Sequence, residues 1–63
     1  MSAEYHERYR GFQIIAARAL NGGWQAKIEG IGALSDYRST ALDAISETKR
    51  YLDEQAAERA LLR

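Results

Sequence analysis

Few side chains in this sequence have the chemistry of a catalytic group. His6 is the single histidine, and histidine is the side chain that exchanges protons near neutral pH. It lies between Tyr5 and Glu7 in a polar stretch, whereas a catalytic base needs a positioned environment. Ser35 and Ser39 lack the accompanying base and glycine elbow that an activated nucleophile requires. We therefore predict no catalytic residue and a protein that is not an enzyme.

Motifs for metal and cofactor binding are also lacking. The chain contains no cysteine, which excludes thiolate metal sites and disulfides, and one histidine does not make a zinc site. Gly30-Ile31-Gly32 is a fragment of a phosphate-binding loop without the third glycine or the strand-loop-helix context, so it indicates a turn or bulge. Asp43 and Glu47, four residues apart, are interpreted as part of a solvated helix face. We predict no metal ion and no cofactor.

Charge gives a weak indication of nucleic-acid binding. Nine basic residues balance nine acidic ones, so the strong positive field that attracts nucleic acid without sequence preference is absent. Aromatic side chains interleaved with basic ones nevertheless suit the stacking of bases on an open sheet face. The candidate contacts for this alternative function are Arg10, Arg18, Lys27 and Arg38.

Turn signals divide the chain into strands followed by one helix. Residues 1–8 are predicted to be a flexible lead-in or a ragged start to the first strand. Strands are predicted over 9–20, 24–29 and 33–38, separated by Asn21-Gly22-Gly23, a strong hairpin signal, and by the glycines near residue 31. A helix is predicted over 40–63, capped by Thr40. The sequence thus predicts a single α+β domain over 1–63: a three-stranded antiparallel meander with one long C-terminal helix packed on one face.

Alternation in the strands and spacings of three and four in the helix predict the core. Trp24, Ala26 and Ile28 alternate with polar residues. The full set of predicted core residues is Phe12, Ile14, Trp24, Ala26, Ile28, Leu34, Ile45, Tyr51 and Leu52.

The small size of the chain favours self-association. Sixty-three residues bury only about 60 % of the surface that the unfolded chain exposes, and oligomerisation is a usual remedy where disulfides and metals are missing. A helix of about 33 Å would also overhang a sheet of this width. We predict a homodimer, through Ala57, Leu61 and Leu62 at the helix end or through the free edge of the first or third strand.

The N-terminal residues have neither the basic region nor the apolar region of a signal peptide. The longest apolar run is too short to span a membrane. We expect a cytoplasmic protein with no membrane partner.

The run from Gly22 to Ile45 resembles the partly RNase-H-like domain of HicB-type antitoxins. Gly22-Gly23-Trp24 matches the Gly-Gly-aromatic opening of the family's second strand, and Thr40 with Ala44 matches its capped helix. The family's proline-rich loop is replaced here by residues 29–34. The resemblance implies a bacterial ββ(β)α domain and an antitoxin-like protein-interaction module with a protein partner encoded nearby. The alternative is another kind of small bacterial domain with the same β-β-β-α plan.

Overall fold

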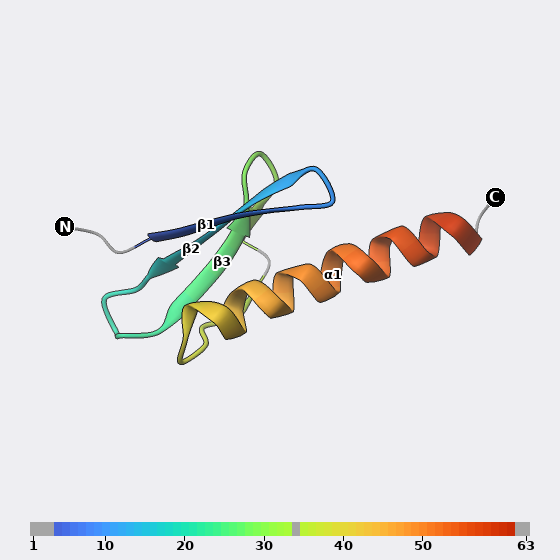
Figure 1. Cartoon of the computed structure of the whole chain (residues 1–63). Coiled ribbons are helices and arrows are strands. Elements are labelled where there is room, and N and C mark those ends of the chain that lie inside the picture. The colour runs from blue at the N-terminus through green and yellow to red at the C-terminus, as the bar shows by residue number, and fades with distance from the viewer. Residues whose placement is uncertain (1–3, 34, 62–63) are drawn as a thin grey trace.

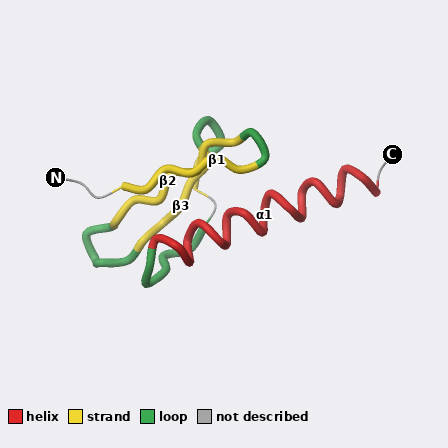
Figure 2. Tube along the Cα trace, in the orientation of Figure 1, coloured by secondary structure: helices red, strands yellow, loops and turns green. Residues whose placement is uncertain are grey.

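An antiparallel sheet followed by one long helix makes up the fold (Figure 1). The structure is a computed structural model and describes residues 4–33 and 35–61. The sheet has the order β1-β2-β3-β4, with neighbouring strands antiparallel. The elements are β1 (Glu4–Tyr9), β2 (Phe12–Arg18), β3 (Trp24–Ile28), the two-residue β4 (Gly32–Ala33) and α1 (Ala41–Leu61). The predicted fold class is confirmed: β1 to β3 form the meander, and α1 packs on one face of it (Figure 2).

The N-terminal residues form a strand, so the prediction of a flexible lead-in over 1–8 is wrong for Glu4–Arg8. β1 pairs with β2 along its whole length, from Glu4 opposite Ala17 to Tyr9 opposite Phe12. The turn between them consists of Arg10 and Gly11 with φ values of 51° and 82°. Two successive positive φ values match the right-handed twist of a two-residue hairpin, and glycine adopts them without strain. The predicted first strand over 9–20 is therefore β2, an inner strand and not an edge.

The second hairpin is the one that Asn21-Gly22-Gly23 predicts. The ends of its loop are joined by a 2.7 Å bond from the Ala19 N–H to the Gly23 carbonyl. The Asn21 side chain accepts a 2.9 Å bond from the Gly23 N–H, and Gly22 has a φ of 89°. The side-chain bond and the positive φ explain why this sequence closes β2 onto β3.

The predicted third strand over 33–38 is present only in part. β4 pairs Gly32 with Ile28, and Arg38 forms an isolated bridge with Trp24. Between them Ser35 replaces a regular ladder bond, because its Oγ accepts a 2.7 Å bond from the Ala26 N–H. This irregular segment covers the outer edge of β3. Leu34 lies outside the described residues.

Helix α1 begins after Thr40, whose Oγ1 accepts a 3.1 Å bond from the Asp43 N–H, as expected for an N-cap. The helix buries Ala44, Ile45, Thr48 and Leu52 against the sheet. The sheet contributes Ile14, Ala16, Ala26 and Ile28 to the same core. The prediction is confirmed for Ile14, Ala26, Ile28, Ile45 and Leu52, whereas Phe12, Trp24 and Tyr51 are partly buried and pack against that core.

The C-terminal part of α1 extends beyond the sheet (Figure 1). The described chain measures 45 × 18 × 16 Å, and Ala57 and Leu61 in the last turns are exposed. The predicted overhang is thus present. Along the described residues, no helix is both long and apolar enough to cross a membrane.

Candidate protein-interaction surface

The long free edge of the sheet is β1, and the opposite edge strand is the two-residue β4. At the opposite edge β3 is covered by β4 and by the segment around Ser35. β1 pairs with β2 on one side and, among the described residues, with no strand on its other side. An edge strand presents unpaired N–H and C=O groups that can pair with another chain.

The hairpin register determines which backbone groups of β1 point outward. Tyr9 and Phe12 close a two-residue hairpin and therefore exchange hydrogen bonds, as do the pairs that follow at every second residue. The carbonyl of Gln13 accepts a 2.9 Å bond from the Glu29 N–H on the β3 side. This bond confirms that the backbone groups of Gln13 point to β3 and that those of its neighbours in β2 point to β1. The N–H and C=O groups that point away from β2 are consequently those of Glu4, His6 and Arg8.

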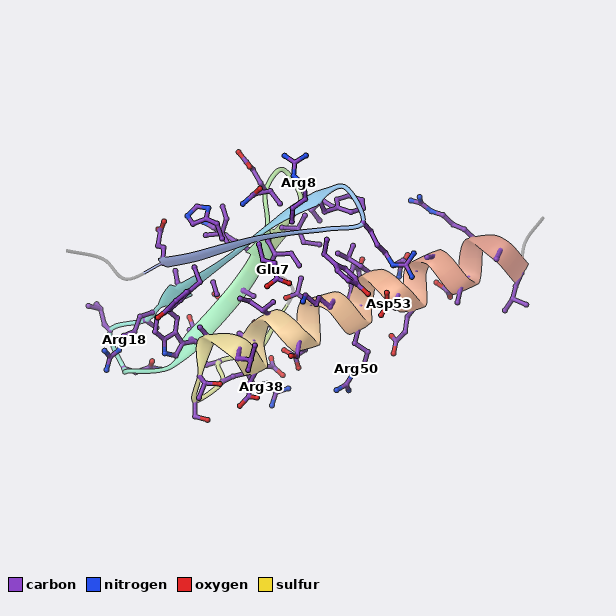
Figure 3. The ribbon with its side chains drawn as sticks, in the orientation of Figure 1. Glu7, Arg8, Arg18, Arg38, Arg50 and Asp53 are labelled. Atoms are coloured by element: carbon purple, nitrogen blue, oxygen red, sulfur yellow. The ribbon has the colours of Figure 1, made fainter. Side chains whose placement is uncertain are left out.

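The two faces of β1 differ in chemistry. Tyr5, Glu7 and Tyr9 share the helix-side face, because Glu7 is opposite the fully buried Ile14. Glu4, His6 and Arg8 project from the opposite face, which α1 does not cover. Figure 3 shows this division for two neighbours: Glu7 points toward the helix and Arg8 points away from it.

An apolar groove lies beside β1 on the helix side. Helix α1 packs mainly on β3 and β2, which leaves the helix-side face of β1 partly open near the start of the helix. The resulting hollow has a volume of about 500 Å³. Its walls are formed by residues from β1, from the start of β3 and from the first turns of α1: Tyr5, His6, Glu7, Trp24, Ser39, Thr40, Ala41, Leu42 and Ile45.

Three large apolar side chains at this groove are accessible to a ligand. The rings of Tyr5 and Trp24 are tilted by 53° with their centroids 5.4 Å apart, a separation at which aromatic pairs attract each other. Tyr5 is 56 % exposed and Leu42 is 70 % exposed. The groove can therefore bury an additional apolar side chain beside the unpaired backbone of β1.

Polar contacts attach the other end of β1 to the helix. Asp53 Oδ1 accepts a 2.8 Å bond from the Tyr9 hydroxyl and a 2.7 Å bond from Arg10 Nε. Lys49 forms an ion pair with Glu7 and lies 5.2 Å from the centroid of the Tyr9 ring. The bonds from Arg10 and Tyr9 hold the pKa of the Asp53 carboxyl below its usual value. These contacts keep the edge strand in place while its backbone stays accessible.

The four predicted nucleic-acid contacts are not gathered into one patch. Arg10 binds Asp53, and Arg38 forms an ion pair with Glu47. The bond from Arg38, together with one from the Asp36 N–H, lowers the pKa of Glu47. Lys27 is exposed on β3 and Arg18 lies at the end of β2, and these two line the same shallow hollow. Two of the four cations are thus neutralised by helix carboxylates.

The predicted dimer contacts at the helix end lie apart from β1. Ala57 and Leu61 are exposed, and Leu62 lies outside the described residues. A second hollow, of about 260 Å³, adjoins the middle of α1 and is lined by Arg10, Phe12, Ile31, Tyr51, Leu52, Gln55, Ala56 and Arg59. Ala57 and Leu61 do not line it.

The side chains with candidate chemistry occupy separate, structural positions. His6 Nε2 is 3.3 Å from Glu4 Oε1, and both side chains are about half exposed. Thr48 donates a 3.1 Å bond to the Ala44 carbonyl in the core, and Ser35 supports β3. Among residues 4–33 and 35–61, no cluster of three or more histidine, cysteine or acidic side chains is placed to hold a metal ion.

The residues of the β1 edge were missed by sequence reasoning. The sequence pattern that indicates this strand is the alternation of Tyr5, Glu7 and Tyr9 with His6 and Arg8. It is followed by Gly11 at the second position of the turn. The charged residues on both faces obscured it.

No protein-family model, curated protein or solved structure matches this chain. The resemblance to HicB-type antitoxin domains therefore stays a prediction from the sequence.

Proposed function

We propose that this protein is a small protein-interaction module that binds an extended polypeptide segment along β1. The observation that supports the proposal is the combination of an unpaired strand edge with the adjoining apolar groove. Strand addition uses backbone hydrogen bonds for affinity and pockets for alternate side chains for specificity. β1 offers both: outward N–H and C=O groups at His6 and Arg8, and a hollow between Tyr5 and Leu42.

The antitoxin-like role is a finer part of the same proposal. It rests on the sequence resemblance, which implies a bacterial protein with a partner encoded by a neighbouring reading frame. Co-purification of the chain with the product of that reading frame would support it, and a partner that binds equally well after β1 is blocked would contradict it.

Blocking the edge without disturbing the fold tests the binding mode. His6→Pro removes an outward N–H that makes no bond within the sheet, and proline is tolerated on edge strands for this reason. His6→Ala is the matched control, because it removes the same imidazole and keeps the N–H. We expect peptides selected from a displayed random library on the parent chain to bind His6→Ala and to lose binding to His6→Pro. Equal binding to both variants would contradict strand addition.

A second pair of variants tests the groove. Leu42→Glu places a carboxylate at its rim, in the first turn of α1, where acidic residues are tolerated well. Losing the burial of one apolar side chain is worth roughly 1.5–3 kcal/mol, so the affinity for the selected peptides should fall at least tenfold. Leu61→Glu makes the same change at the exposed helix end. An equal effect of the two substitutions would exclude a specific role for the groove.

A further inference from the structure

Three side chains of β1 follow one another in an order of charge that matches the same strand running in the opposite direction. Glu4, His6 and Arg8 follow at every second residue on the face that α1 does not cover. Their backbone groups are also those that point to the open edge. An approaching strand therefore meets a carboxylate, an imidazole and a guanidinium group in sequence.

We propose that the segment bound along β1 is β1 of a second copy of this chain, an inference that rests on the proposed function. The two strands run antiparallel about a two-fold axis that passes beside His6. In this register Glu4 of each copy faces Arg8 of the other, and the two His6 residues face each other. All three pairs are formed by outward-pointing backbone groups, so each can exchange two hydrogen bonds.

Charge selects this register over its neighbours. A shift of two residues in one direction loses both Glu4–Arg8 pairs, because Arg8 then faces His6. It also places Glu7, the partner of Lys49, opposite the second Glu7, and like charges that face each other directly are destabilising. A shift of two residues in the other direction leaves only residues 4–6 of the described strand overlapped. Shifts by one residue would pair outward backbone groups with inward ones and lose the ladder.

The geometry of the molecule favours a second copy as the occupant. A two-fold axis brings the same surface of each copy together and closes the assembly. The joined sheet would have no exposed β1 edge, and its outer edges would be the two-residue β4 strands with the irregular segments around Ser35. In the joined sheet both helices lie on the same face, one on either side of the paired strands. Each copy therefore keeps its own groove beside Tyr5 and Leu42.

Charge reversal and its complementation test the register. Glu4→Arg alone sets two guanidinium groups against each other at both ends of the interface, and Arg8→Glu alone sets two carboxylates against each other. Opposite-charge pairs across strands are weak individually, but reversing two at once is expected to raise the dimer dissociation constant about thirtyfold. The double variant Glu4→Arg/Arg8→Glu restores both pairs with their signs exchanged and should dimerise like the parent.

A mixture of the two single variants gives the sharpest result. Each single variant should sediment as a monomer at concentrations where the parent is a dimer, whereas an equimolar mixture should form a heterodimer with both ion pairs. Arg50→Glu is the control, because it makes the same charge change at an exposed position on α1. Its dimer should dissociate at the same concentration as that of the parent.

Several outcomes would overturn the proposal. These are a parent chain that sediments as a monomer at high micromolar concentration, single variants that still dimerise, a mixture that stays monomeric, or an equal effect of Arg50→Glu. If the parent chain is a monomer and the selected peptides fail to bind His6→Pro, the second copy is rejected and strand addition is retained. If His6→Pro keeps both peptide binding and self-association, strand addition and pairing with a second copy are both rejected.

Discussion

The hydroxyl of Ser35 substitutes for a strand partner at the buried edge of β3. Its Oγ accepts a 2.7 Å bond from the Ala26 N–H and donates a 3.0 Å bond to the Asp36 carbonyl. Ser35 is 7 % exposed and Ala26 is fully buried. In the variant Ser35→Ala, the Ala26 N–H loses its acceptor at a position that water does not reach.

The expected loss follows from that unsatisfied group. An unpaired buried donor costs roughly 1–3 kcal/mol, and a chain of this size loses about 4–8 °C in melting temperature for each kcal/mol. We therefore expect Ser35→Ala to melt on the order of 10 °C below the parent chain. Thermal unfolding followed by circular dichroism measures the difference.

A matched serine and a second observable make the test specific. Ser46→Ala, at an exposed helix position, should change stability by less than about 0.5 kcal/mol. In Ser35→Ala the amide proton of Ala26 should exchange faster than those of its neighbours in β3. An unchanged melting temperature with an unchanged Ala26 exchange rate would refute the assigned role of Ser35.

Three further perturbations address the core, the polar contacts of β1 and the helix end. Trp24→Ala removes a wall of the groove, the packing against the core and the contact with Tyr5, and should cost about 3 kcal/mol; an unchanged melting temperature would contradict this placement. The depressed pKa of Asp53 stabilises the fold above the ordinary aspartate value of 3.8, and this contribution is lost as the pH falls through the lower folded value. Asp53→Asn should therefore flatten the acid limb of a stability–pH curve, and an identical limb in parent and variant would exclude the contact. Deleting residues 57–63 should leave both the folded structure and self-association intact by circular dichroism and sedimentation, whereas a monomeric product would transfer the interface to the helix end.

The elements with local signals were predictable from the sequence. The Thr40 cap, the apolar stripe of α1 and the alternation of Trp24, Ala26 and Ile28 each follow from the neighbouring residues alone. Asn21-Gly22-Gly23 gave the β2–β3 hairpin for the same reason. Local propensity and tertiary packing agree at these positions, as is usual in natural sequences.

The elements that depend on contacts far apart in the sequence were not predictable. β1 has Glu7 on its helix-side face, which suggests exposure until the ion pair with Lys49 is known. The turn that precedes β2 places Arg10 at a positive φ that non-glycine residues rarely adopt, so its sequence gives little warning. Ser35 lies in the predicted strand over 33–38, and nothing in the neighbouring residues indicates that its hydroxyl completes the hydrogen bonding of β3.

The free edge of β1 determines both proposals for this protein, and amide hydrogen exchange tests it most directly. In a dilute sample the N–H groups of His6 and Arg8 should exchange rapidly, while those of Glu7 and Tyr9, which bond to β2, should be protected. At high concentration the His6 and Arg8 amides should become protected as the second strand pairs with them. Equal protection of all four amides in the dilute sample, or no alternation along β1, would contradict the account of an unpaired edge.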